Sequence, residues 1–386
     1  MEKLSKRRRD QKLTKTRFED FSTEIFFEIF DYLTGNEIYK SFFGLNHRFN
    51  ELIWNTANIH LNLSCTTTKF RRNVDRLFPK QNITSISILY KNVQLLKTLF
   101  NSIDECRLRS ISILNVPLCG FETSIPEMLN TFKYQLNRLK IDFTDMCYTG
   151  TGARAAQSFA YLLTELPMLK QLVLNYSEGI DPITYMPLAV INNTITNLTL
   201  TLYDANRLAP LLYRFEQLII LNIHFPKNIR KMGLVRCQAT EYYRHNLSEK
   251  TSTDYPMKIR HIHIYNCFML LDRVDQIFKF ISSPNLVTVN LCNCKHPVVR
   301  SPMGRRELPF IDGAHWHDLL AKYLSSSVKL KLLHIEYPYV GATMSVTSLA
   351  HVKEKLMKYN RSTSSWSIHC SYNQEKYLLV FDFLSA

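Results

Sequence analysis

The chain has 386 residues, of which 46% are hydrophobic, with only 10 glycines and 14 prolines and a formal net charge of +15. This composition excludes an intrinsically disordered chain and allows two or three ordinary domains or one elongated array. Nine scattered cysteines, the absence of a secretory start and the absence of a run of about 18 apolar residues predict reduced thiols, no membrane span and a cytoplasmic or nuclear location.

Residues 1–17 are polar and lack apolar periodicity, so we expect a disordered basic tail. Eight lysines and arginines oppose two acidic residues there, which leaves the remainder of the chain only mildly basic. The run Lys6-Arg7-Arg8-Arg9 is typical either of a nuclear-import signal or of a solvated tail that no receptor recognises.

Residues 18–56 change to helical spacing and predict a small bundle of three short helices. We expect Ser22 to cap the first helix and Gly35 to close it in the left-handed conformation. Thr34 and Glu37 have capping-box spacing for the second helix, and Asn46 precedes the third. The apolar residues that would line the helices are Phe18, Phe21, Ile25, Ile29, Phe30, Leu33, Ile38, Phe42, Phe49, Leu52 and Ile53.

This segment resembles an F-box, whose pattern opens with Leu-Pro-x-Glu-Ile and closes with Arg-Trp-x-x-Leu. Phe21 and Ser22 stand at the leucine and proline positions, and Phe49 stands at the tryptophan position. The resemblance covers 39 of 386 residues and implies docking on the adaptor Skp1 and, through it, on a cullin. The residues it assigns to Skp1 binding are Phe21, Ser22, Glu24, Ile25, Ile29, Leu33, Ile38, Leu45, Arg48 and Phe49. Most of the apolar ones are also expected in the core of a three-helix bundle.

From residue 57 onward, the chain repeats the frame L-x-x-L-x-L, which is typical of a strand that must stack on a neighbour to bury its apolar side. Most of the spacings lie near the period of roughly 20–29 residues that leucine-rich repeats show, and two longer ones indicate insertions. The frames begin at Ile83, Leu108, Leu136, Leu169, Ile195, Leu218, Ile259, Leu286 and Leu330.

Stretches with helical spacing, such as Arg154–Leu166, separate several of these frames. We therefore predict an α/β fold: an F-box-like helical domain at 18–56, then a leucine-rich-repeat-like solenoid at 57–386 with a parallel inner sheet and outer helices. The ninth position of the frame is Asn or Cys only at Cys267 and Cys294, so the repeats are irregular.

Strand residues between the apolar positions should face outward, because side chains alternate along a strand. This row is polar, with basic residues in the third repeat and histidines in later repeats. A surface that binds a partner would show this pattern, and so would a sheet face exposed to solvent. The residues we assign to substrate binding are Arg138, Lys140, Asn175, Thr199, Asn222, His224, His261, His263, Tyr265, Asn290 and His334.

The motifs of common enzymes are missing. Gly150-Thr151-Gly152 lacks the lysine of a phosphate-binding loop, and no nucleophile elbow or kinase set is present. The Cys292-x-Cys294-x-His296 cluster has the wrong spacing for zinc. We expect neither catalysis nor a metal nor a cofactor.

The sequence favours a substrate-recognition adaptor of a Skp1–cullin–F-box ubiquitin ligase, which holds a protein substrate near a ubiquitin-charged enzyme. Two alternatives remain: an F-box scaffold without a ligase role, and a basic nucleic-acid-associated protein. The latter would use the tail and the inserts 226–256 and 295–315, where basic residues accompany aromatic or proline residues. Solvated loops are the simpler explanation of the inserts.

Overall fold

A computed structural model describes most of the first half of the chain and scattered strands of the second half. The described residues are 17–64, 70, 74, 76–100, 107–117, 121, 124–144, 151–176, 191–202, 211–212, 214–225, 258–265, 285–295, 322, 329–338, 354, 366–373 and 378–385. The basic tail through residue 16, the insert 226–256 and most of the insert 295–315 lie outside them, as do Cys267 and His296.

Three short helices come first, as the spacing predicts. They follow a 3-10 turn, η1 (Phe18–Asp20), and are α1 (Thr23–Asp31), α2 (Gly35–Phe42) and α3 (His47–Asn55). Thr34 and Glu37 form the expected capping box of α2, and the Asn46 side chain caps α3 by accepting from the Phe49 N–H. Gly44 takes the positive φ of +79° that breaks the chain between them.

Two local predictions at these helices are wrong. Ser22 stands at the N-cap of α1, but its side chain makes no capping hydrogen bond; it bonds the Glu24 carboxylate instead, which, together with the Glu24 backbone N–H, lowers the pKa of Glu24. Gly35 does not close α1. It is the first residue of α2, where a Cβ would lie 2.7 Å from Leu61 Cδ2 and 2.9 Å from Ile59 Cγ2. The glycine is required for close packing, not for a left-handed turn.

Within the described residues, twelve strands form one sheet in the order β1 to β10, then β12, then β11. Strands β1 to β10 all run parallel to their neighbours in this series, the last pair being β9 and β10. Strand β12 is antiparallel to both β10 and β11. The strands are β1 (Ile59–Asn62), β2 (Ile83–Leu89), β3 (Ser110–Val116), β4 (Arg138–Phe143), β5 (Gln171–Asn175), β6 (Asn197–Thr201), β7 (Ile220–His224), β8 (His261–Tyr265), β9 (Thr288–Lys295), β10 (Lys329–Pro338), β11 (Trp366–Asn373) and β12 (Leu378–Ser385).

The predicted frame coincides with these strands, and its apolar residues are buried from Ile83 through Val289. The parallel inner sheet with helices beside it is therefore confirmed. The last two strands depart from it, since a solenoid of parallel strands does not predict an antiparallel end. The sequence frame also starts one strand late, because β1, with Ile59 and Leu61 buried, precedes the first full repeat.

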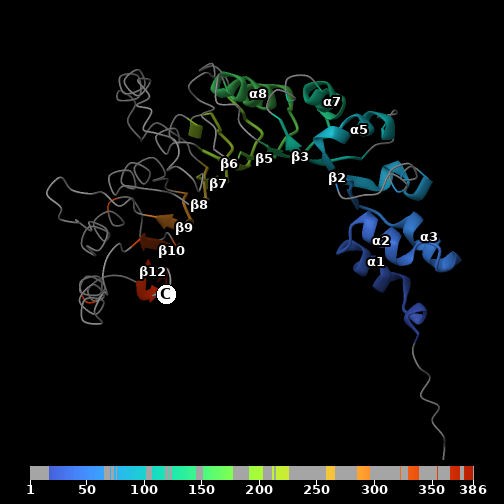
Figure 1. Ribbon diagram of the computed structural model, residues 1–386, viewed down its shortest axis with the longest axis horizontal. Coiled ribbons are helices and arrows are strands. Elements are labelled where there is room, and N and C mark those ends of the chain that lie inside the picture. The colour runs from blue at the N-terminus through green and yellow to red at the C-terminus, as the bar shows by residue number, and fades with distance from the viewer. Residues whose placement is uncertain are drawn as a thin grey trace, which may run out of the picture.

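Among the described residues, three helices lie on the outer side of the arc that the sheet describes (Figure 1). They are α5 (Gln94–Leu99), α7 (Ser124–Phe132) and α8 (Thr151–Glu165). The short 3-10 turns η2 (Lys80–Asn82) and η3 (Tyr90–Asn92) directly precede and follow β2 in the chain. α8 begins three residues before the predicted stretch and ends one residue before its end. A single buried cluster runs from the three N-terminal helices, through the sheet, to Val289.

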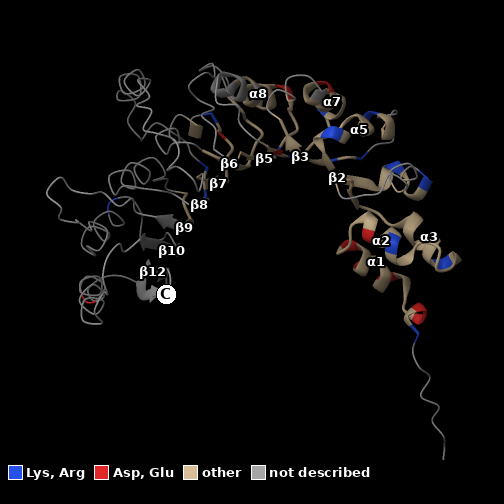
Figure 2. Cartoon of the chain, in the orientation of Figure 1, with Lys and Arg blue, Asp and Glu red and all other residues tan. Residues whose placement is uncertain are grey.

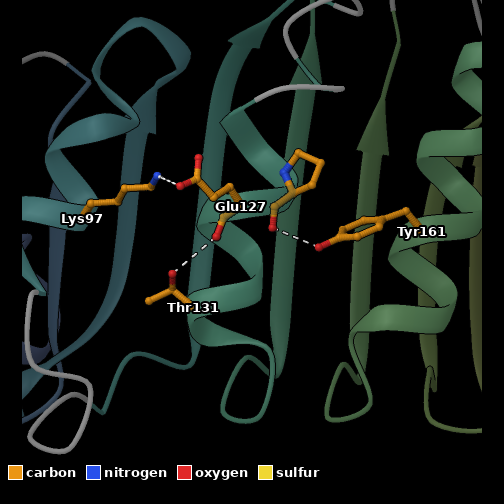
Figure 3. A network of polar contacts seen from close by, with 5 residues as sticks. Lys97, Glu127, Thr131 and Tyr161 are labelled. Atoms are coloured by element: carbon orange, nitrogen blue, oxygen red, sulfur yellow. Dashed lines mark hydrogen bonds and ion pairs between the residues drawn. The ribbon is translucent and has the colours of Figure 1, made fainter.

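Polar contacts join the outer helices to one another (Figure 3). Lys97 Nζ on α5 lies 2.5 Å from Glu127 Oε1 on α7, and the Tyr161 hydroxyl on α8 donates to the Pro126 carbonyl oxygen at 2.9 Å. The Thr131 hydroxyl donates to the Glu127 carbonyl oxygen one turn earlier in α7. The Lys97–Glu127 and Tyr161–Pro126 contacts connect successive repeats on the side of the sheet opposite the predicted partner row.

Aromatic and aliphatic residues fill the eighth position of several frames, at the end of the strand or just after it, one residue before the position where regular leucine-rich repeats place asparagine. Phe143 and Tyr176 stack with ring centroids 4.1 Å apart and planes at 8°, and both are buried. Leu202 and Phe225 occupy the corresponding positions of later repeats and are also buried. The stacking of Phe143 on Tyr176 therefore holds the ends of β4 and β5 together, next to the position that lacks the usual polar side chain.

Candidate functional site

The interior of the three-helix region consists mainly of phenylalanine side chains. Phe26 lies edge-on to Phe49 with ring centroids 5.0 Å apart, and Phe30 meets Phe42 at the same separation. All four rings are buried. Edge-to-face pairs of this kind add to the burial energy of the rings. The half-exposed Phe18 packs over them, with its ring centroid 5.1 Å from that of Phe26.

The residues assigned to Skp1 binding fall into three groups. Ile38 and Phe49 are each 1% exposed and belong to the core, so a partner cannot reach their side chains in this structure. Ile29 and Leu33 are partly buried against that core, and Arg48 is also partly buried. The exposed residues of the set are Phe21, Ser22, Glu24, Ile25 and Leu45.

Three of these exposed residues are large and apolar: Phe21 is 37% exposed, Ile25 41% and Leu45 60%. Exposed apolar side chains that lie close together typically mark interaction sites, whereas isolated ones are ordinary. Polar contacts bring the loop before α3 next to the segment before α1, because the Asn46 amide donates to Glu19 Oε1 at 3.4 Å. Phe21 and Leu45 therefore come from neighbouring segments.

Arg48 supports this arrangement from within. Its guanidinium donates to the carbonyl oxygens of Glu19 and Phe21, the latter at 2.6 Å, and lies 5.6 Å from the centroid of the Phe26 ring. The F-box resemblance assigns Arg48 to the partner surface, but in the structure its hydrogen bonds hold residues 19–21 against the bundle.

The structure exposes other large apolar side chains that the sequence argument did not select. Tyr32 is 90% exposed, and Phe18, Phe43 and Trp54 are each about half exposed. Phe18 also stacks on the core rings of Phe42 and Phe49. The apolar stripe of the first helix includes Phe18, but nothing in the spacing alone distinguishes a packed ring from a presented one.

The second candidate surface is the face of the sheet opposite the outer helices. Parallel register places its residues in rows across the strands, which lie about 4.8 Å apart. One row joins His60, Ser85, Ser110, Arg138, Gln171 and Asn197. The next row joins Asn62, Ser87, Ser112, Lys140, Val173, Thr199, Asn222, His263 and Asn290.

Near β4 this face is basic, with one internal pair. Lys140 Nζ lies 2.9 Å from Asp142 Oδ2, and Asp142 Oδ1 accepts from the Asn175 amide at 2.6 Å. Arg138 is exposed. Of the predicted substrate-binding residues, Lys140 and Asn175 are thus brought together through Asp142, a neighbour on the same face that was not assigned to binding.

Near β7 and β8 the face is aromatic. The rings of His224 and Tyr265 stack with centroids 4.6 Å apart, and His263 lies 6.4 Å from Tyr265 in a nearly parallel orientation. Burial lowers the pKa of His224, so its imidazole is neutral at pH 7. The Asn222 amide donates to the Thr199 hydroxyl at 3.1 Å. His261 and Asn290 are half-buried on the same face.

One residue of the predicted substrate-binding set, His334, belongs to β10, but its side chain lies outside the described part of the structure. The same holds for Cys292 and Cys294 on β9, whose spacing had argued against a zinc site. Within that part, no group of three or more His, Cys, Asp or Glu side chains has the arrangement of a metal site. No helix among the described residues has the length and apolar character of a membrane span.

Lysines and arginines are spread along the described arc, from the three helices to β8 (Figure 2). The basic character that the sequence shows is therefore not confined to one end of it. Arg107, Arg109, Lys170, Lys258 and Arg260 are exposed at or just before the starts of β3, β5 and β8.

Comparison with known proteins gives little further information. No family model matches the chain, and no curated protein matches it. One of the solved structures that it resembles is the crystal structure of the Rad7 and Elc1 complex in yeast, at 14% identity and a TM-score of 0.38. That match covers 72% of this chain and 64% of the other.

Proposed function

We propose that this protein is a substrate-recognition adaptor of a Skp1–cullin–F-box ubiquitin ligase. In this proposal residues 18–56 dock on Skp1, and through it on a cullin, while the polar face of the sheet binds a protein substrate. The chain performs no bond chemistry itself. It contributes by keeping a substrate close to a ubiquitin-charged enzyme, which raises the effective concentration of the two reactants.

The observation that carries the proposal is the surplus of exposed apolar side chains on a bundle whose core is already filled. Phe21, Ile25 and Leu45 are exposed, and each belongs to the F-box resemblance. Burying the exposed half of one such side chain at an interface stabilises a complex by about 1 kcal/mol. The central residues of such an interface usually carry most of the binding energy.

Surface variants of the whole chain test the docking step. Purified protein carrying Ile25→Asp or Leu45→Asp should capture purified Skp1 at least about tenfold more weakly than the unchanged chain. Tyr134→Asp is the matched control, because Tyr134 is 72% exposed and lies between α7 and β4, away from the three helices. Unchanged melting temperatures would show that all three variants remain folded.

Equal capture of Skp1 by all the variants, or no capture by the unchanged chain, would refute the docking proposal. The ligase role is tested separately, by ubiquitin transfer to a co-purifying protein in a complex reconstituted with a cullin. Skp1 capture without transfer would instead support the scaffold alternative. The nucleic-acid alternative predicts that the oligonucleotide association constant falls with salt. The expected fall is roughly tenfold per phosphate contact for each tenfold rise in salt concentration.

A further inference from the structure

The face of the sheet over β2 and β3 carries four serines at the centre of longer side chains. They form two register pairs, Ser85 with Ser110 and Ser87 with Ser112. A serine side chain is shorter than the side chains beside it, so the four hydroxyls lie closer to the backbone than their neighbours do. The flanking residues are His60 and Asn62 on β1, and Arg138 and Lys140 on β4.

Three of these hydroxyls have hydrogen-bonding capacity to spare. The Ser85 hydroxyl bonds the His60 Nδ1 atom at 2.8 Å. Among the described residues, no side-chain hydrogen bond is formed by Ser87, Ser110 or Ser112, and all three are half-buried. Each serine hydroxyl has one hydrogen to donate, so this part of the sheet presents donors to a ligand that accepts hydrogen bonds.

Among the described side chains of these strands, one cation beside the serines has no anionic partner. Lys140 is paired with Asp142, which leaves Arg138 as the exposed charge of the row. Burial first, and then the positive charge of Arg138, lower the pKa of His60 despite the opposing influence of Glu37. The imidazole is therefore neutral at pH 7. The net charge facing a ligand here is close to that of one cation.

We propose that the face of β1 to β4 binds a carboxylate side chain, aspartate or glutamate, in an extended segment of a protein partner. Arg138 is the cationic anchor and the hydroxyls of Ser110 and Ser112 are additional donors. A guanidinium presents two parallel N–H groups that fit a carboxylate. This assignment rests on the proposed function, since it names the class of substrate that the adaptor would recognise.

Charge matching favours a carboxylate over a phosphate. A phosphate group carries a charge between about −1.5 and −2 at pH 7. It would meet one free arginine, and Asp142, two residues beyond Lys140 on β4, would repel it. A carboxylate with one negative charge matches the net charge of the site.

The next register pair along the same face is apolar. Leu89 and Leu114 pair across β2 and β3, and both are half-buried. Each is two residues beyond a serine of the same strand, about 7 Å away along it. The partner segment is therefore expected to carry an apolar side chain near its acidic one.

Fluorescence anisotropy of rhodamine-labelled hexaglutamate tests the proposal with the full chain. Arg138→Gln should weaken binding about tenfold, the effect of losing a charged hydrogen-bonded pair. Arg260→Gln is the matched control: Arg260 is exposed one residue before β8, four strands away from β4, and its removal changes the net charge equally. It should weaken binding less than about twofold, as a distant surface charge does. Ser110→Leu fills the space over the serines without changing charge, and should weaken binding severalfold.

Each other outcome overturns the proposal. Equal losses for Arg138→Gln and Arg260→Gln would mean diffuse attraction to a basic protein, and no binding of hexaglutamate would mean no site. Tighter binding of hexaphosphoserine than of hexaglutamate, lost in Arg138→Gln, would make this a phosphate site. The peptide assay contains no Skp1, so the two proposals can fail separately. If the peptide result overturns the carboxylate site but Skp1 is captured, the proposed function still holds. If Skp1 is not captured but the peptide binds as expected, the carboxylate site still holds.

Discussion

The substitution Gly35→Ala should destabilise the protein although it places a better helix former in α2. A Cβ at this position would lie 2.7 Å from Leu61 Cδ2 and 2.9 Å from Ile59 Cγ2, closer than real Cβ contacts come. Leu61 and Ile59 are buried, so neither can move aside into solvent. Overpacking of this kind costs about 1–3 kcal/mol, while replacing helical glycine returns about 0.5–1 kcal/mol. We expect a net loss of about 1–2 kcal/mol.

Urea denaturation followed by circular dichroism measures this loss, and a double-mutant cycle tests its cause. Leu61→Ala alone should cost about 2–5 kcal/mol through the cavity it leaves. In its presence the further cost of Gly35→Ala should fall to less than half, because the nearer of the two close contacts has gone. If Gly35→Ala costs as much in the Leu61→Ala background as in the unchanged chain, then the clash with β1 is not the reason for the glycine.

Two further predictions concern buried polar groups. Asn36→Leu removes both hydrogen bonds between the Asn36 side chain and the Asn62 backbone, at 2.6 and 3.0 Å; we expect a loss of about 2 kcal/mol, with faster hydrogen exchange at the Asn62 amide, and unchanged exchange there would contradict it. Burial raises the pKa of Tyr176, so its contribution to stability is complete below the unfolded-state pKa of about 10 and is lost as the pH rises above it. Between about pH 9 and pH 11, the free energy of unfolding measured in urea should therefore fall less for the Tyr176→Phe variant than for the unchanged chain. An equal fall in both proteins would show that ionisation of Tyr176 does not affect stability.

The strands were predictable because their burial depends on alternation, which a sequence shows directly. In β8, for example, Ile262 and Ile264 are buried between three half-buried neighbours, as the frame requires. The parallel order followed from the repeat, since similar units stack in the same direction. The antiparallel pairing of β12 was not predictable in this way, because no frame marks it.

The candidate docking site was only partly predictable. An apolar stripe shows which residues leave water when a helix packs, but not whether the neighbour is the same chain or another. Phe49 and Ile25 both match the F-box pattern, yet one is buried and the other exposed. The role of Arg48 depends on carbonyl groups 27 and 29 residues away, and no local pattern encodes those contacts.

The role of Gly35 was wrongly predicted for a related reason. Glycine suits turns and helix ends, and local reasoning placed Gly35 at one. In the structure its role depends on β1, which lies more than about twenty residues later, because the missing side chain leaves room for Ile59 and Leu61. The neighbouring Asn36 also contacts β1, through the Asn62 N–H and carbonyl groups. Contacts between distant segments override local preference here.

The contact between α2 and β1 also covers part of one edge of the sheet. A strand at the end of a sheet offers unpaired N–H and C=O groups to other chains, and proteins cover or interrupt such edges. Asn36 occupies both hydrogen-bonding groups of Asn62 much as a neighbouring strand would. A fragment that begins after residue 56 would leave this edge open to self-association, so aggregation in such a fragment would reflect an uncovered strand, not a repeat array that fails to fold.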